Sequence, residues 1–388
     1  MQTESQQGPL RVLMLFTILN RGGAETMVMN YYRNIDRSRV QFDFAVHRQE
    51  RGAYEDEIER LGGRIYRFMP LNPLTFHQYR KQISHFFDEH PEYKIIHGQC
   101  SESGYFFYRE AAKRGIPVII AHGHSSHVPF DLKLIMRTYL KHRMRPYLTH
   151  GFTCGDEAAI WLFGKKLGKR AIHLNNAIDT RRYVFSEEKR NKVRSELGLS
   201  DSTLVVLHVG SFVMPKNHPF MIDVFQQFHQ LHADSVLLLA GAGPDRKSVE
   251  DKVARLGLAD SVRFLGSRDD IPDVMMAADA FLFPSIFEGL PVTLIEAQST
   301  GLDCLISDRI PKEVIVTDRM HVMSLQQSPS QWADQLLQLA TSKHERTSTL
   351  QQIIDAGYDV RKNAPLLEDF YISQVEKGLT RTLHEPKK

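Results

Sequence analysis

The chain has 388 residues, which is long for one domain and sufficient for two that each bury a core. Its 49 basic and 46 acidic residues are too balanced to indicate nucleic-acid binding, and three scattered cysteines argue against a disulfide framework or a thiolate zinc site. No run approaches the roughly 18 apolar residues that cross a bilayer, and the first ten residues lack the apolar core of a signal peptide. We therefore expect a cytoplasmic protein, in solution or lying on a membrane.

The first half of the chain alternates apolar runs with helical stretches. Strands are predicted at residues 12–18, 42–46, 65–68, 95–98 and 118–121. This alternation predicts a parallel sheet with helices on both faces, in which ligands bind at the carboxyl ends of the strands. Gly22, His97 and residues 122–125 would lie at that edge. Gly22 and Gly23 allow a tight turn and the close approach of a ligand, although a plain turn explains them equally well.

Three histidines, His122, His124 and His127, follow the fifth predicted strand. An extended His-x-His segment points two rings the same way and suggests a metal site. Because no acidic or cysteine partner is nearby in the sequence, we do not expect a metal here. His124 is left with three interpretations, as a residue that binds an acceptor, binds a phosphate, or is solvated.

Residues 131–146 form a predicted basic amphipathic helix. Such a helix can dock on anionic lipid, and Lys165, Lys166, Lys169 and Arg170 add positive charge shortly after it. A helix that packs on its own sheet and exposes a basic face has the same pattern, and this second interpretation is favoured.

The second half begins near residue 183, after an LNNAID turn, and repeats the alternation. The predicted domains are therefore 1–183 and 184–365, followed by a C-terminal helix over 366–388. The strand at 204–209 leads into a loop that contains Lys216. A lysine there suits a diphosphate as a mobile point charge, although solvated loop lysines are common.

The stretch FPSIFEGLPVTLIEAQ, residues 283–298, predicts a strand end, a loop closed by Gly289, and a helix with Pro291 in its first turn. The free N–H groups of that helix, near Leu290, form an anion site. Glu288 and Glu296 bracket it, and carboxylates accept hydrogen bonds from sugar hydroxyls. An anion site between two such carboxylates predicts a nucleotide sugar, although many α/β proteins share the spacing without this function.

This stretch resembles the signature of retaining glycosyltransferases of the GT4 family, and the likeness is greatest to bacterial enzymes of capsular and exopolysaccharide synthesis. The resemblance covers about residues 10–360. It implies an α/β GT-B fold, with two Rossmann-like domains that face each other across a cleft and a last helix that crosses back to the first domain.

The resemblance also implies roles for individual residues. Glu288 would face the donor sugar, Glu296 the nucleotide ribose, and Lys216 the donor phosphates, while His122 would lie near the hexose. The remaining donor-binding positions that it implies are Gly22, Gly23, Gly210, Gly266, Arg268, Gly289 and Leu290. One departure is Ser211, because the family has arginine directly after the glycine that corresponds to Gly210. Half of the usual cationic clamp is therefore missing.

The predicted activity is retaining transfer of a hexosyl unit from a nucleoside diphosphate sugar to a hydroxyl acceptor on a growing, lipid-linked polysaccharide. Glu288, His122 and Lys216 are the predicted catalytic residues, and fixed positive charge stabilises the departing diphosphate. UDP is the favoured nucleotide, but recognition of the base by the backbone leaves the base open. The chain has no convincing DxD motif, so neither a metal nor another cofactor is expected.

Two alternatives remain. A sugar-nucleotide 2-epimerase shares the GT-B architecture and would convert the donor alone. A non-catalytic nucleotide-sugar-binding partner of another transferase would convert nothing, and Ser211 keeps that interpretation open. A turnover assay separates the three.

Overall fold

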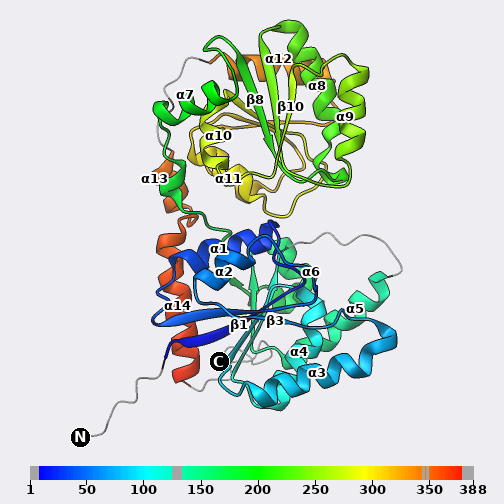
Figure 1. Cartoon of the computed structure of the whole chain (residues 1–388), viewed down its shortest axis with the longest axis vertical. Coiled ribbons are helices and arrows are strands. Elements are labelled where there is room, and N and C mark those ends of the chain that lie inside the picture. Colours follow the sequence, from blue (N-terminus) through cyan, green and yellow to red (C-terminus); the bar gives the residue numbers. More distant parts are fainter. Residues whose placement is uncertain (1–7, 125–132, 343–345, 347–348, 378–388) are drawn as a thin grey trace, which may run out of the picture. The chain divides into compact units, whose positions relative to one another are not determined.

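The computed structural model describes residues 8–124, 133–342, 346 and 349–377, and the chain forms two compact units (Figure 1). Unit 1 combines Met1–Ala177 with Val360–Lys388, and unit 2 is Ile178–Asp359. The predicted boundaries at 183 and 365 both lie later in the chain than the observed ones. The reason is a parallel bridge between Ile178 and Asp359, which brings together the two points where the chain crosses between units.

Unit 1 is built on a seven-stranded, entirely parallel sheet with the order β3-β2-β1-β4-β5-β6-β7. Its strands are β1 (Leu10–Phe16), β2 (Val40–Val46), β3 (Ile65–Arg67), β4 (Ile95–Gly98), β5 (Val118–Gly123), β6 (His150–Thr153) and β7 (Ile172–His173). The five predicted strands are all present. The two short strands β6 and β7 were not predicted, because HGFT and IH carry too few apolar residues to stand out.

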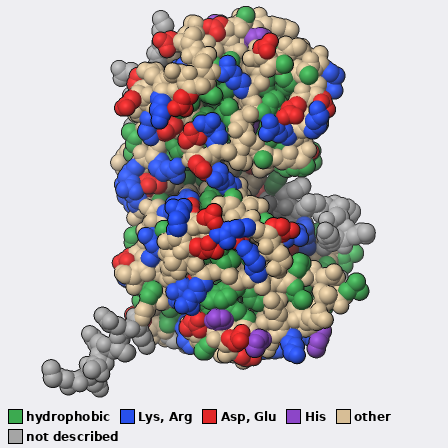
Figure 2. Space-filling view, in the orientation of Figure 1, with side chains coloured by type: hydrophobic (Ala, Val, Ile, Leu, Met, Phe, Trp, Pro, Cys, Tyr) green, Lys and Arg blue, Asp and Glu red, His purple; other side chains and the backbone are tan. Residues whose placement is uncertain are grey.

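The helices of unit 1 cover both faces of this sheet. Acidic and basic side chains are interspersed over the surface of the unit (Figure 2). The helices are α1 (Gly23–Asn34), α2 (Glu55–Arg60), α3 (Phe76–Glu89), α4 (Tyr105–Lys113), α5 (Lys133–Met144), α6 (Asp156–Gly168) and α14 (Val360–Glu376), with short 3₁₀ turns η1 (Pro73–Thr75), η2 (Ser101–Gly104) and η3 (Arg145–Tyr147). Alternate residues of β1 point into opposite cores, Met14 toward α1 and α14 and Leu15 toward α3 and α4.

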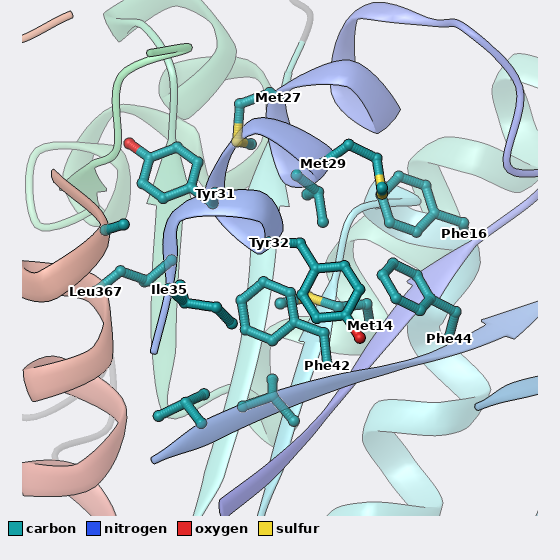
Figure 3. Close-up of a cluster of buried hydrophobic side chains, with 14 of the residues drawn as sticks. Met14, Phe16, Met27, Met29, Tyr31, Tyr32, Ile35, Phe42, Phe44 and Leu367 are labelled. Carbon is teal, nitrogen blue, oxygen red and sulfur yellow. The ribbon is translucent and has the colours of Figure 1, made fainter. Parts of the chain in front are cut away.

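The core beneath α1 and α14 is rich in aromatic rings (Figure 3). Tyr32 stacks on Phe42 with ring centroids 5.3 Å apart and meets Phe44 edge-on at 5.7 Å. Leu367 of α14 lies beside Ile35 in the same cluster. Burial of several such side chains, each worth about 1.5 to 3 kcal/mol, holds the C-terminal helix onto the sheet of unit 1.

Helix α14 begins earlier than the predicted helix. It starts at Val360 and runs through Pro365, which the helix accommodates although proline lacks the N–H that an interior position donates. Val360, Ala364, Leu367 and Tyr371 recur at helical spacing and are buried. The part of the predicted helix beyond residue 377 lies outside the described residues.

Unit 2 has a six-stranded parallel sheet with the order β10-β9-β8-β11-β12-β13. Its strands are β8 (Leu204–Val209), β9 (Ser235–Ala240), β10 (Val262–Gly266), β11 (Ala280–Phe283), β12 (Cys304–Ser307) and β13 (Met320–Met323). Its helical segments are η4 (Thr180–Tyr183), α7 (Glu187–Glu196), η5 (Met214–Lys216), α8 (His218–Leu231), α9 (Arg246–Arg255), α10 (Ile271–Ala277), α11 (Val292–Ser299), η6 (Lys312–Val314), α12 (Pro329–Ala340) and α13 (Leu350–Asp355).

Each sheet has a switch point, where consecutive connections leave in opposite directions. In unit 1 it lies between β1 and β4, and in unit 2 between β8 and β11. Ligands of open parallel sheets bind at the carboxyl ends of the strands beside such a point. In both units we therefore expect ligands to bind at the loops that follow these four strands.

None of the helices in the described part of the chain has the length and hydropathy needed to cross a bilayer.

Candidate active site

The loops after β8 and β11 are joined at the switch point of unit 2. The Ile286 N–H donates to the Pro215 carbonyl at 2.8 Å, and the side-chain amide of Asn217 donates to the Pro284 carbonyl at 3.1 Å. Asn217 adopts the left-handed conformation, with φ of 58°, which asparagine tolerates better than most residues. These contacts fix the loop that carries Lys216 against the loop that carries Glu288.

Lys216 and Glu288 form an ion pair at this point. The distance from Nζ to Oε1 is 2.7 Å, and the two side chains are only 16% and 11% exposed. The ammonium also lies 4.8 Å from the centroid of the Phe283 ring. Lys216 is therefore not a solvated loop lysine, because a carboxylate and an aromatic face hold its charge in place.

Gly210 makes room for this arrangement. A Cβ at Gly210 would lie 2.9 Å from His208 Nε2 and 3.3 Å from the Lys216 side chain. Two further glycines pack on the same loop: a Cβ would lie 2.0 Å from the Gly210 oxygen at Gly241, and 2.4 Å from the Phe212 oxygen at Gly243. The glycine pair after β9, which is weak evidence of function from sequence alone, thus shapes the loop before Lys216.

Two histidines that the sequence analysis did not identify lie beneath this loop. His208 is fully buried on β8, and its Nδ1 donates to the Leu282 carbonyl at 3.0 Å. Burial, followed by the nearby His218, holds the pKa of His208 well below its usual value, and burial lowers the pKa of His218 to about 4. Both rings are therefore neutral beside Lys216. The sequence does hold one sign of His208, because it is the single polar residue in the apolar run LVVLHV.

The N-terminus of α11 is close to the predicted position but differs in one detail. Pro291 is the N-cap residue, with extended backbone angles, and helical residues begin at Val292, so proline does not occupy the first turn as predicted. Pro291 makes no side-chain cap bond, and the Leu294 N–H donates to the Pro291 carbonyl at 3.1 Å, so the N–H groups of Val292 and Thr293 are the ones that an anion at this end would meet.

Glu296 lies on α11 and is held by a residue that the sequence analysis missed. The Tyr183 hydroxyl of η4 donates to Glu296 Oε1 at 2.6 Å. Burial raises the pKa of Glu296, and the bond from Tyr183 acts in the opposite direction. The carboxylate is therefore oriented before any ligand arrives. Tyr183 follows shortly after Ala177 and Ile178, where the chain passes from unit 1 to unit 2. No pattern in the sequence links it to Glu296.

Gly266 and Arg268 lie at the end of β10, on the far side of β9 from β8. Gly266 has φ of 68°, which favours glycine. The Arg268 guanidinium is engaged with Asp270, through Nε at 2.7 Å. Because Asp270 already binds the guanidinium, we expect a ligand at this position to contact backbone groups and not the Arg268 side chain.

In unit 1, Gly22 and Gly23 follow β1 and begin α1. Gly22 is the N-cap of α1, and a Cβ there would lie 2.3 Å from Glu25 Oε2, while a Cβ at Gly23 would meet nothing within 4 Å. Burial raises the pKa of Glu25, which the sequence analysis did not identify. Gly22 thus accommodates a carboxyl group, and Gly23 leaves open space at the start of the helix.

His122 belongs to a chain of buried side chains. Its Nδ1 lies 3.3 Å from His97 Nε2, and its ring stacks on His124 with centroids 4.2 Å apart. His124 is half-buried and bonded to Gln99 Oε1 at 2.7 Å, so it is not simply solvated. Ser125 and His127 lie outside the described residues, among which no group of three histidine, cysteine or acidic side chains could hold a metal ion.

The structure brings together Lys216, Glu288, Gly210, Gly289 and Leu290 at the switch point of unit 2. It places Gly22, Gly23 and His122 at the equivalent edge of unit 1, and Gly266 and Arg268 two strands away from β8. In unit 2 this geometry combines the fixed ammonium of Lys216 with the N-terminus of α11. Glu288 precedes that helix and Glu296 lies within it.

Comparison with known proteins gives consistent results. The family model "Glycosyl transferases group 1" matches residues 203–342. The chain is 32% identical over 386 residues to the "Putative glycosyltransferase EpsF" of Bacillus subtilis (strain 168), covering 96% of this chain and 98% of that one. It is also 25% identical over 206 residues to the UDP-Gal:alpha-D-GlcNAc-diphosphoundecaprenol alpha-1,3-galactosyltransferase of Escherichia coli, and this match covers 52% of this chain and 53% of that one.

Among solved structures, the fold is similar to that of Anabaena Alr3699/HepE in complex with UDP. The TM-score is 0.74 at 17% sequence identity, and the match covers 95% of this chain and 100% of that one. The predicted α/β fold of two Rossmann-like sheets is confirmed.

Proposed function

Because this chain belongs to the group 1 glycosyltransferases and has the GT-B fold, we propose that it transfers a hexosyl unit from a UDP-sugar with retention of configuration and without a metal. That it transfers sugar from a nucleotide sugar follows from the family. The observation that carries the mechanistic proposal is the Lys216–Glu288 ion pair beside the N-terminus of α11. UDP is supported by the Escherichia coli relative, which is named for UDP-Gal, and by the UDP that HepE binds.

Charge stabilisation is the main task that this geometry supports. When the bond between the anomeric carbon and the diphosphate oxygen breaks, negative charge develops on the diphosphate. The Lys216 ammonium and the first N–H groups of α11 are fixed in advance and need not reorganise as that charge appears. These groups provide the positive charge that a bound cation would otherwise supply, so the proposed mechanism needs no metal.

The retention that we propose gives Glu288 an orienting role. Its Oε1 is paired with Lys216, so we give it the role of orienting the sugar rather than attacking it. The acceptor hydroxyl attacks the anomeric carbon from the face that the diphosphate leaves. Its oxygen forms the new glycosidic bond, and its proton passes to the departing diphosphate oxygen.

We propose a lipid-linked saccharide as the acceptor. The name of the Escherichia coli relative specifies an acceptor of this kind, a diphosphoundecaprenol carrying GlcNAc. Such an acceptor stays at the membrane, so a transferase that docks there meets it at high local concentration.

Helix α5 is the proposed site of peripheral contact with anionic membrane on the cytoplasmic side. Leu140 and Met144 anchor it in the core, whereas Ile135, Met136 and Tyr139 are 78%, 53% and 56% exposed. Apolar side chains are visible at the surface where α5 lies (Figure 2). Arg137, Arg143 and the other basic residues of α5 add positive charge beside them, a combination that suits anionic lipid.

A transfer assay with a panel of UDP-, GDP-, ADP- and CMP-sugars tests the proposal, using undecaprenyl-diphosphate saccharides as acceptors, with and without EDTA. We expect transfer from a UDP-sugar that survives EDTA, and an anomeric coupling in the product spectrum that matches the donor. An inverted product would overturn the retaining mechanism, and loss of activity in EDTA would overturn metal independence. Epimerised donor without acceptor would indicate the 2-epimerase, and binding without turnover the non-catalytic partner.

Anionic vesicles test the membrane contact separately. The wild-type chain is expected to co-sediment with them, and the Ile135→Ser/Met136→Ser variant to remain in the supernatant. Equal sedimentation of both would contradict the assignment of α5.

A further inference from the structure

Two histidines occupy positions in unit 1 where the strands are otherwise apolar. His97 lies on β4 beside Ile120 of β5, and His122 lies two residues beyond Ile120, so both side chains project from the same face of the sheet. Both are at most 1% exposed. Their rings stack at 16° with centroids 5.4 Å apart, and Phe152 meets both edge-on.

Helix α14 covers this pair and contributes a hydroxyl to it. The Tyr371 oxygen lies 2.6 Å from His97 Nδ1, and His97 Nε2 lies 3.3 Å from His122 Nδ1. The three side chains therefore form a continuous hydrogen-bonded chain, Tyr371–His97–His122. His122 Nε2, at its end, is buried and has no hydrogen-bond partner among the described residues.

The direction of the protons along this chain follows from the single proton of Tyr371. Burial raises the pKa of Tyr371 well above its usual value, so the phenol keeps that proton. His97 Nδ1 is its one hydrogen-bond partner among the residues that the structure describes. If the hydroxyl accepted from this nitrogen, its own proton would be buried without an acceptor, so we assign the hydroxyl as the donor. Burial lowers the pKa of His97 to about 3, which leaves one proton on its ring, at Nε2. His97 then donates to His122 Nδ1.

His122 is neutral for the same reason, since burial holds its pKa well below the usual value. With Nδ1 accepting from His97, its own proton is on Nε2. His124 also stacks on the His122 ring, and its Nε2 already donates to Gln99 Oε1. The chain of hydrogen bonds therefore ends, at the carboxyl edge of the sheet, in one oriented N–H for which the described residues offer no acceptor.

We propose that Tyr371 and His97 are positioning residues that fix His122 in its Nε2–H form, so that His122 donates a hydrogen bond to an oxygen of the transferred sugar. This inference rests on the proposed function. A buried donor without a partner costs free energy until a ligand supplies an acceptor, and a site of this kind rejects a ligand that lacks the matching oxygen. The substrate class is thus a hexose with a hydroxyl at the contacted carbon, and its deoxy analogue is the poor substrate.

The first test reads the tautomer without using activity. Nitrogen-15 NMR of the histidine-labelled full chain distinguishes protonated from unprotonated ring nitrogens. We expect a protonated Nε2 and an unprotonated Nδ1 at His122 in the wild-type chain, and a mixture of both forms in Tyr371→Phe. A protonated His122 Nδ1 in the wild-type chain would overturn the proposal, as would an unchanged tautomer in the variant.

A matched control exists in the same unit. The Tyr79 hydroxyl lies 2.8 Å from His47 Nε2, and His47 Nδ1 donates to the Phe16 carbonyl at 2.9 Å. Tyr79→Phe thus removes an equally buried tyrosine–histidine bond whose far end is a backbone carbonyl instead of a second histidine. We expect a similar loss of thermal stability in both variants, and a changed His122 tautomer only in Tyr371→Phe.

The second test measures discrimination between the preferred donor and its series of monodeoxy analogues. We expect the wild-type chain to reject one analogue strongly, and Tyr371→Phe to reduce that preference about tenfold while Tyr79→Phe leaves it unchanged. Equal preferences in all three proteins would overturn the inference and leave the proposed function intact. If the wild-type chain transfers no sugar, the proposed function fails, and the NMR result still decides whether Tyr371 sets the tautomer.

Discussion

The two units place opposite kinds of chemistry at the equivalent edges of similar sheets. Unit 2 presents charge, because Lys216 and Glu288 are paired at 2.7 Å beside the open end of α11. Unit 1 presents neutral hydrogen-bonding groups, because burial lowers the pKa values of His97, His122 and His124 and keeps their rings uncharged. In the function that we propose, the same strand arrangement serves two tasks: unit 2 stabilises a charge that develops, and unit 1 recognises hydroxyls whose charge does not change.

The largest expected effect comes from removing the cation. Lys216→Ala should lower kcat by about 100-fold or more, because the diphosphate would depart without its fixed counter-charge. Steady-state kinetics measures this. The matched control is Lys252→Ala, since Lys252 also forms a short pair, 2.6 Å from Asp223, but on the α8–α9 surface of the same unit. Equal losses in both variants would show that Lys216 acts through folding alone.

Glu288→Ala should follow, with turnover reduced roughly tenfold to 100-fold and unfolding free energy by only about 1 kcal/mol. The ion pair is mostly buried, but the Phe283 ring stays beside the Lys216 ammonium and offsets part of the cost of leaving it without its carboxylate. Kinetics and thermal denaturation together check this. Glu250→Ala, which breaks a surface pair on α9, is the control. A large loss of stability with intact turnover would refute the role of Glu288.

The sequence was sufficient to predict the alternating strands, both parallel sheets and the neighbourhood of residues 283–298. Apolar runs such as LVVLHV report burial directly, and loops after such strands meet at one edge by topology. What could not be predicted was pairing across long separations. Tyr371 lies 274 residues from His97, and Tyr183 lies 113 from Glu296, so neither contact leaves a local pattern. The exact crossing points depended on the bridge between Ile178 and Asp359 in the same way.

Ser211→Arg adds positive charge to the unit that already presents it. Ser211 is exposed, so the longer side chain meets no steric barrier, and a guanidinium binds phosphate oxygens through several N–H groups. Affinity for UDP should rise about threefold to tenfold, measured by calorimetry at two salt concentrations. Ser211→Gln, of similar length but neutral, is the control. No change in affinity would indicate that other groups already supply the second half of the clamp.

Tyr183→Phe is expected to have the smallest effect and tests whether orientation without charge also matters in unit 2. The change removes the hydroxyl that donates to Glu296 Oε1, which leaves the carboxylate free to rotate and raises its pKa further. Because a carboxylate held in place accepts from a ribose hydroxyl at a lower entropy cost, affinity for UDP should fall about threefold. Tyr358→Phe, which removes a hydroxyl that donates to the Glu313 carbonyl in the same unit, should leave it unchanged. If both variants bind UDP as the wild-type chain does, Glu296 does not depend on Tyr183, and the contrast between a charged unit and a hydrogen-bonding unit becomes sharper.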